Sequence, residues 1–371
     1  MIGWFHVSLV FCLKSLTLRL RICHFAVRRP AVPPTSWLEP YLISYLPTHS
    51  SYHSTLSLMT LSDIQQAAQR IQPLIHRTPV LTSESIDRRA GCRIFFKGEN
   101  FQKAGAFKMR GAANAVLSLS EADRAKGVAT HSSGNHGQAL ARAAQVVGCP
   151  AYVVMPTTAP RIKQRAVASY GAEITFCEPT LVARETTLAE VVRRTGATFV
   201  HPYNDAHVIA GQGTAALELI HDTEALDVVM APVGGGGLLS GTAIATHALL
   251  PQAQVVAGEP AGADDAYRSL RAGRIIPSES PRTLADGLLT SLGDQTFPII
   301  QEHVSRIITV SEEEIVAAMR LVWERMKIII EASCAVPLAA LLKEKETFAG
   351  QRVGIILTGG NVDLTQLPFA D

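Results

Sequence analysis

Short apolar runs that suit β-strands alternate along this chain with longer segments of helical periodicity. Regular alternation of this kind is typical of βαβ units, whose successive strands are parallel. Residues 62–75 carry apolar side chains at helical spacing, and we expect that helix to end at His76–Pro79 because proline disfavours helix in the residue before it. The sequence therefore predicts an α/β protein with a parallel sheet. The strand-like runs are IFF from 94, VAT from 128, AYVVM from 151, ITF from 174, TFVH from 198, VVM from 228, VVAG from 255 and GIIL from 354.

The bulk composition excludes several classes of protein. A chain of 371 residues can form one large or two modest domains with a substantial core. The formal net charge is +2 and 18% of the residues are charged, so nothing indicates a nucleic-acid partner. The six cysteines form no CxxC pair, which argues against structural zinc and favours a reduced, cytoplasmic protein.

Four short motifs each follow one of the apolar runs. Ligands of open α/β sheets bind beyond the carboxyl ends of the strands, so we expect the four motifs to meet in one cleft. In chain order they are FFKGENFQKAGAFKMRG at 95–111, SSGNHGQAL at 132–140, GGGG at 234–237 and TGGN at 358–361.

Together the four motifs resemble those of fold-type II pyridoxal-phosphate (PLP) enzymes, and most closely the serine racemase and serine/threonine dehydratase group. The resemblance extends from about Met59 to about Leu364. It implies the tryptophan synthase beta-like fold, with two open twisted α/β domains and the cofactor between them. The large domain would comprise residues 59–130 and 201–371, and the small domain residues 131–200. A homodimer is also expected.

Residues 1–58 differ in composition from the rest. They hold five Lys/Arg residues and one acid, Glu39. The apolar opening at 1–13 is shorter than the roughly 20 residues of a membrane span and lacks the charged start of a secretory signal. Such an acid-poor segment could direct the chain to an organelle. Because family-like sequence begins almost immediately after Met59, we expect instead that Met59 is the native start and that the protein is not attached to a membrane.

A lysine amine is required to bind PLP covalently and to exchange it for substrate. Lys97, Lys103 and Lys108 all lie in the first motif, and composition alone does not choose between them. The resemblance assigns this role to Lys108 and places Phe107 against the cofactor ring.

The glycine run Gly234, Gly235, Gly236 and Gly237 joins a strand-like run to a helical one. Backbone N–H groups of such a turn, together with the following helix N-terminus, suit a phosphate dianion. The run is neither GxxxxGK nor GxGxxG, which argues against a nucleotide or a dinucleotide. A flexible loop is the alternative interpretation.

The second motif resembles the loop that contacts the substrate carboxylate and the cofactor's 3′-oxygen. The resemblance assigns Asn135 to the 3′-oxygen and the segment Ser132, Ser133, Gly134, Asn135 and His136 to the substrate. Ser133 matches the serine that faces Cα from the side opposite the lysine in serine racemases. A helix-capping serine is the plainer interpretation, and both can hold together.

Thr358 matches the hydroxyl residue opposite the pyridine nitrogen of the cofactor. A hydroxyl does not favour a protonated ring nitrogen as a carboxylate would, which suits β-elimination. Tyr203 departs from the pattern, because it stands where animal racemases have asparagine.

The segment GEPAGADD at 258–265 resembles the divalent-cation site of serine racemases. Glu259 and Asp265 would supply carboxylates and Ala263 a backbone carbonyl, all hard oxygen ligands suited to Mg²⁺, Ca²⁺ or Mn²⁺. Two acids in a loop are otherwise usually solvated.

The resemblance implies an ammonia-lyase that converts L-serine or L-threonine to a 2-oxo acid and ammonium by β-elimination. Serine racemase and 3-hydroxyaspartate dehydratase are the alternatives within the same fold. From other classes, the chain could be a PLP-binding protein without turnover or a dinucleotide-dependent dehydrogenase. The absence of GxGxxG argues against the dehydrogenase.

Overall fold

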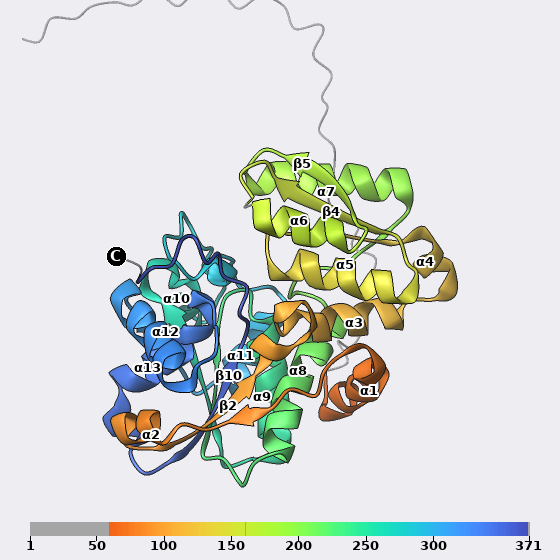
Figure 1. The fold of residues 1–371 in the computed structure, drawn as a ribbon. Coiled ribbons are helices and arrows are strands. Elements are labelled where there is room, and N and C mark those ends of the chain that lie inside the picture. Colours follow the sequence, from red (N-terminus) through yellow and green to blue (C-terminus); the bar gives the residue numbers. More distant parts are fainter. Residues whose placement is uncertain (1–58, 160, 370–371) are drawn as a thin grey trace, which may run out of the picture. The chain divides into compact units, whose positions relative to one another are not determined.

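The computed structural model describes residues 59–159 and 161–369 of the chain. The expectation about residues 1–58 lies outside the described residues. Within the described part, strands form two sheets with helices packed around them (Figure 1). Both sheets are almost entirely parallel, as the alternation of strand-like and helical segments predicts.

The larger sheet has six strands in the order β1-β2-β10-β7-β8-β9. All neighbours are parallel except β1, which runs antiparallel to β2 at one edge. β1 and β9 were not predicted, and β1 has only two residues, too short for a periodic signal. The strands are β1 (Val80–Leu81), β2 (Arg93–Gly98), β7 (Val228–Pro232), β8 (Gln254–Pro260), β9 (Arg306–Val310) and β10 (Arg352–Leu357).

The smaller sheet has four parallel strands in the order β5-β4-β3-β6. Its residues run from 128 to 199, so β3 lies across the expected domain boundary at 131, and the division of the chain into domains stays a prediction. The strands are β3 (Val128–His131), β4 (Ala151–Pro156), β5 (Glu173–Cys177) and β6 (Thr198–Phe199).

The first helix ends earlier than its apolar periodicity predicts. α1 (Leu61–Ile71) is followed by a 3₁₀ turn, Gln72–Leu74, rather than by a further helical turn. Pro73 lies inside that turn, and proline has no N–H to continue the α-helical hydrogen bonds.

Helices cover the larger sheet on both faces, which explains why the middle residues of its central strands are consecutive, buried and mostly apolar. One core layer lies between the sheet and α2, α12 and α13, and a second lies against α8, α9 and α11 (Figure 1). The remaining α-helices are α2 (Glu84–Ala90), α3 (Lys108–Ser118), α4 (Glu121–Lys126), α5 (Asn135–Val147), α6 (Arg161–Ser169), α7 (Leu181–Thr195), α8 (Ala206–His221), α9 (Gly237–Leu249), α10 (Asp265–Ala272), α11 (Thr296–His303), α12 (Glu312–Met326) and α13 (Ala332–Lys343).

Short 3₁₀ turns complete the described elements. They are Gln72–Leu74, Glu99–Phe101, Lys103–Gly105, Ala261–Ala263, Asp286–Leu288 and Lys345–Phe348. Among the helices of the described residues, none has both the length and the hydrophobicity that crossing a membrane would require.

Candidate active site

Lys108 is the first residue of α3, beyond the end of β2 and a pair of 3₁₀ turns. Its Nζ donates a hydrogen bond to the backbone oxygen of Pro202 at 2.8 Å. Burial lowers the pKa of the Lys108 amine to about 8, and the nearby Glu331 carboxylate opposes that shift. The amine also lies 5.1 Å from the centre of the Phe107 ring. A lysine in these surroundings loses its proton far more readily than an exposed one.

Backbone hydrogen bonds join the first and fourth motifs. The Phe107 N–H donates to Thr358 O at 2.9 Å, and the Gly360 N–H donates to Gly105 O at 3.0 Å. Gly105 has a φ of +70°, a conformation that glycine adopts without strain. These contacts fix the start of α3 against the end of β10.

An amide bridge adds the second motif to the same cluster. Asn361 Nδ2 donates to Asn135 Oδ1 at 3.0 Å and to Ala104 O at 2.8 Å. Asn135 Nδ2 donates to Glu331 Oε1 at 2.8 Å. The orientation of the Asn135 amide is therefore set from both of its ends. Burial raises the pKa of Glu331 to about 7, with Asp286 adding to the effect and Asn135 opposing it.

The glycine run forms a buried turn between β7 and α9. Gly236 is the N-cap of α9 with a φ of +90°, and α9 begins at Gly237. A Cβ on Gly235 would overlap the Tyr203 ring, so only glycine fits beneath that side chain. Thr296 Oγ1 donates to Gly235 O at 2.9 Å, and the first N–H groups of a helix have no acceptor within that helix. An anion would fit at this helix N-terminus, and the phosphate site stays a prediction.

Thr358 lies at the end of β10 with its side chain buried. Its hydroxyl has no oxygen or nitrogen partner at hydrogen-bonding distance within the described part of the chain. The Cys334 thiol lies against it, and burial raises the pKa of that thiol to about 12. A thiol is a weak hydrogen-bond partner, so this buried hydroxyl can still bond to a polar atom of a ligand.

The substrate motif follows β3 and leads into α5. Gly134 is the N-cap of α5, the Gly134 N–H donates to Ser132 Oγ at 3.3 Å, and Asn135 begins the helix. Ser133, offered above as a helix cap, does not cap α5 with its side chain. Ser133 is partly exposed.

Two histidines beside Lys108 are neutral near pH 7. Burial lowers the pKa of His136 to about 3 and that of His201 to about 4, and the positive charge of Lys108 adds to both effects. His201 Nδ1 accepts from the N–H groups of Tyr203 and Asn204 at 3.3 and 2.9 Å. Both imidazoles therefore contribute hydrogen bonds and no charge to the surroundings of the Lys108 amine.

The other two lysines of the first motif are placed differently. Lys97 is fully buried, donates to Thr78 O at 2.7 Å and pairs with Glu218 at 2.7 Å, so its amine is committed to structure. Lys103 lies in the 3₁₀ turn that precedes α3 and is partly exposed. Of the three, Lys108 is the one whose amine lies beside Phe107 and Pro202 at the start of α3.

The residues of the expected cation site lie together at the end of β8. Glu259 Oε1 and Oε2 accept from the N–H groups of Ala266 and Tyr267, each at 2.8 Å, and Ala263 is buried in the adjoining 3₁₀ turn. Neither oxygen of the buried Asp265 has a hydrogen-bond partner of good geometry among the described residues, although the Ser278 hydroxyl and the Leu292 N–H lie nearby. Burial raises the pKa of Asp265 to about 6, although the nearby Ser278 hydroxyl opposes this.

No group of three His, Cys, Asp or Glu side chains that could hold a metal ion occurs among the described residues. A cation at Asp265 would thus rely on two carboxylates, backbone carbonyls and water. The unpartnered Asp265 carboxylate fits that role.

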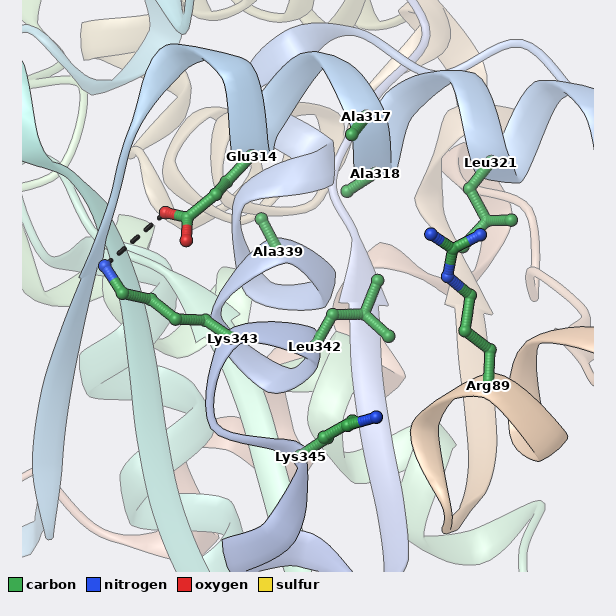
Figure 2. A pocket seen from close by; sticks show the side chains of 9 residues that line it. All are labelled: Arg89, Glu314, Ala317, Ala318, Leu321, Ala339, Leu342, Lys343 and Lys345. Carbon is green, nitrogen blue, oxygen red and sulfur yellow. Dashed lines mark ion pairs between the residues drawn. The ribbon is translucent and has the colours of Figure 1, made fainter.

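A cavity of about 320 Å³ lies elsewhere, between α2, α12 and α13 (Figure 2). None of the predicted site residues lines this cavity. Lys343, one of the positively charged side chains that line it, points toward Glu314 (Figure 2). The active site at the four motifs stays a prediction. The lining comprises Arg89, Glu314, Ala317, Ala318, Leu321, Ala339, Leu342, Lys343 and Lys345.

Comparison with known proteins decides which family the chain belongs to. Residues 71–359 match the family model described as "Pyridoxal-phosphate dependent enzyme". The chain belongs to this family. The match runs from Ile71, the last residue of α1, to Gly359, just beyond β10, and so includes the first three motifs and the first half of the fourth. It confirms the fold-type II prediction and the membership inferred from the motifs.

Relatives of high sequence identity indicate which members of the family this chain is similar to. A beta-hydroxyaspartate dehydratase of Paracoccus denitrificans (strain Pd 1222) is 54% identical over 310 residues, which cover 84% of this chain and 98% of that protein. A serine racemase of Dictyostelium discoideum is 52% identical over 317 residues, covering 84% and 98% of the two chains. Its crystal structure superposes with a TM-score of 0.80 over 83% of this chain and all of the other. The crystal structure of a T.th. threonine deaminase superposes with a TM-score of 0.79 at 46% identity, over 83% of this chain and all of the other.

The residues present fit the cofactor that the family implies. The Lys108 amine, the buried glycine turn and the unpaired Thr358 hydroxyl lie at the ends of strands that share one sheet. Each offers the kind of group that PLP needs: an amine for its aldehyde, N–H donors for its phosphate and a neutral hydroxyl for its ring nitrogen.

Several residues of this site were missed by the sequence analysis. Glu331, which holds Asn135, precedes α13 outside any motif, and no sequence signal marks it. Asn361 belongs to the quoted TGGN motif but was given no role. The Pro202 carbonyl is a backbone group, and its part in binding Lys108 follows only from the fold.

Proposed function

We propose that the chain is a PLP-dependent ammonia-lyase that removes water from L-serine or L-threonine. The observation that carries this proposal is the Lys108 amine. Its pKa is lowered to about 8, and its hydrogen-bond partner is a neutral carbonyl rather than a carboxylate. Such an amine is available both to bind an aldehyde and to accept a proton near neutral pH. The relatives, which include dehydratases and racemases of β-hydroxy amino acids, support the same reaction class.

The chain's own residues would bind and orient the amino acid. The N-terminus of α5 lies within the Ser132–His136 segment, where a carboxylate is favoured by the helix dipole and by the first N–H groups of the helix, which have no acceptor inside it. The Ser132 and Gly134 N–H groups already donate to Val154 O and Ser132 Oγ. Glu331 and Asn361 fix the Asn135 amide at the edge of this segment. PLP, when bound through Lys108 with its phosphate at Gly234–Gly237, would supply the electron sink that acidifies Cα.

Lys108 would then act as the base. Once released by the substrate, its neutral amine would accept the Cα proton, and the β-hydroxyl would leave as water on taking up one proton, which the protonated Lys108 amine can return. The enamine that remains hydrolyses to a 2-oxo acid and ammonium. Neutral His136 and His201 add no positive charge that would further weaken the amine as a base.

Product analysis tests the reaction class. Purified protein given PLP should release ammonium and the matching 2-oxo acid in equal amounts from L-serine or L-threonine, measured by coupled assay and by mass spectrometry. L-Alanine, which has no leaving group, is the matched control and should give neither product. Bound PLP without any release of ammonium from hydroxy amino acids would reject the lyase proposal.

A second candidate substrate is 3-hydroxyaspartate, and Arg184 favours it. Arg184 lies near the start of α7, where its Nε donates to Thr180 O at 3.4 Å. Burial lowers the pKa of His131, and the positive charge of Arg184 lowers it further. His131 directly precedes the substrate segment. A cation there would attract the second carboxylate of 3-hydroxyaspartate. The relative of Paracoccus denitrificans supports the same candidate, and adding 3-hydroxyaspartate to the product assay compares the three substrates directly.

Serine racemase activity is the third candidate, supported by the Dictyostelium discoideum relative and by Ser133. Racemisation requires an acid–base group on each face of Cα, whereas elimination requires one. Ser133 is partly exposed and lies one residue before the N-cap of α5, and its hydroxyl would supply the second group.

We also propose a divalent cation, Mg²⁺ in the first instance, at Glu259, Ala263 and Asp265. Chelation should lower the melting temperature, because a ligand that binds only the folded state stabilises it by mass action, by about 2.7 kcal/mol when present at 100 times its Kd. Added Mg²⁺ should restore the melting temperature in the parent protein but not in Asp265→Asn. Identical melting of chelated and Mg²⁺-loaded parent protein would reject the site. The homodimer and the cytoplasmic location stay predictions.

A further inference from the structure

Helix α3 presents two functional faces within its first turn. Lys108 and Arg110 are two residues apart, which separates their side chains by about 200° around the helix axis. Lys108 Nζ reaches Pro202 O, whereas Arg110 is fully buried among residues that follow β2 and lie on α8. α3 itself packs against α8 on one side and α5 on the other (Figure 1). The contacts that hold the Arg110 side chain therefore also determine the direction of the Lys108 side chain.

Two carboxylates bind the Arg110 guanidinium through hydrogen bonds. Its Nε and Nη2 donate to the two oxygens of Glu99 at 2.7 and 2.8 Å, and its Nη1 and Nη2 donate to the two oxygens of Glu218 at 2.9 and 2.8 Å. Thr214 Oγ1 accepts a further bond from Nη1 at 3.1 Å. Two bidentate pairs define both the position and the plane of a guanidinium, which a lysine ammonium could not satisfy.

The backbone of α3 is pressed against α8 at the same level. A Cβ on Gly211 of α8 would overlap the Arg110 carbonyl and the Gly111 Cα. The Gly111 N–H donates to the side chain of Gln212 at 3.1 Å. Close backbone approach together with the doubly paired guanidinium leaves α3 little freedom to shift along α8.

We propose that Arg110 is a positioning residue for the catalytic lysine, holding the first turn of α3 so that the Lys108 amine stays in its buried place beside Pro202. This inference rests on the proposed function, because Lys108 is the base of that reaction. A purely structural ion pair would stabilise the fold without governing the environment of one particular amine. The two roles therefore predict different measurements.

The titration of the Lys108 amine is the first measurement, made on the protein without cofactor. Glu331, His136 and His201 are the ionisable groups that interact with Lys108, and none of them is altered by the variants below. Competitive acetylation at a series of pH values, followed by peptide mass spectrometry, gives the pKa of each lysine. Arg110→Lys keeps the positive charge but loses the planar guanidinium that makes the two bidentate pairs. We expect it to move the Lys108 pKa from about 8 toward the value of about 10.4 of a solvated lysine.

The turnover of the loaded enzyme is the second measurement. A base displaced by about an ångström costs roughly 100-fold in rate, so kcat of Arg110→Lys should fall by about 10- to 100-fold with KM little changed. Lys97→Met is the matched control: Lys97 pairs with the same Glu218 but lies on β2 rather than on α3. It should change neither the Lys108 pKa nor kcat. Glu99→Gln, which keeps the shape of the site, replaces Arg110→Lys if that variant does not fold, and should shift both readouts in the same direction.

Three outcomes overturn the inference. One is a folded Arg110→Lys or Glu99→Gln variant with the parent Lys108 pKa and kcat. The second is a Lys97→Met variant that shifts both readouts as far as Arg110→Lys does, which would make the network a general packing feature. The third is a parent protein whose Lys108 titrates like an exposed lysine, which would also remove the observation behind the proposed function. The first two outcomes do not contradict the proposed function.

Discussion

Replacing Lys108 with alanine should abolish covalent attachment of PLP and lower turnover by at least about four orders of magnitude. The variant loses both the amine that binds the cofactor and the base that accepts the Cα proton. Borohydride reduction and peptide mapping of the parent protein should place the pyridoxyl group on the peptide that contains Lys108. Attachment in the parent should quicken as pH rises through about 8, because the neutral amine is the reacting form and burial lowers its pKa to that value.

Lys103→Ala is the matched control for this experiment. Lys103 belongs to the same motif and is partly exposed, so its removal should leave attachment and turnover near the parent level. The thermal stability of Lys108→Ala should be close to that of the parent, since removing a buried amine also removes the cost of burying it. An intact covalent cofactor in Lys108→Ala would disprove the assignment of the lysine.

Ser133→Ala should eliminate D-serine formation, and dehydration of D-serine, while largely sparing ammonia release from the L-amino acids. Elimination uses one base, on the Lys108 side of Cα, whereas racemisation needs a second group on the opposite side. Chiral chromatography of the amino acids that remain after incubation with L-serine measures the first activity. Ammonium release measures the second.

Retention of bound PLP is the control for Ser133→Ala, because the substitution is small and leaves the amides of Asn135 and Asn361 in place. Equal loss of both activities in a variant that keeps its cofactor would contradict the division of roles between the two faces of Cα. A parent protein that forms no D-serine would remove the racemase candidate and leave the dehydratase candidates.

The sequence predicted the parts of the fold that follow from local pattern. Apart from β1 and β9, the strands of the two described sheets fall on apolar or β-branched runs that stand out in the sequence, and α3 begins at the lysine that the motif indicated. β9, RIITV at 306–310, was missed although its residues are apolar and β-branched, and β1 was missed because two residues give no periodicity. Pro73 shortened α1 below the length that its apolar spacing predicted.

The candidate site was predictable only where a motif marks it. Lys108, the glycine turn and Thr358 were chosen from short segments, and the fold brings those segments together. Glu331 and the Pro202 carbonyl were not foreseen, since they contribute through long-range contacts: Asn135 and Glu331 are 196 positions apart, and Lys108 and Pro202 are 94 apart. The pairing of Arg110 with Glu218 spans 108 positions and is invisible to any local pattern.

The lengths of the edge strands bear on how this enzyme avoids self-association through its sheets. An outermost strand exposes unpaired N–H and C=O groups, to which a strand of another molecule can bind. β1 at one edge of the larger sheet and β6 at one edge of the smaller have only two residues each, and β1 runs against the direction of its neighbour. These two edges therefore offer too short a ladder for an incoming strand, which leaves β9 and β5, of five residues each, as the edges where aggregation during folding would begin.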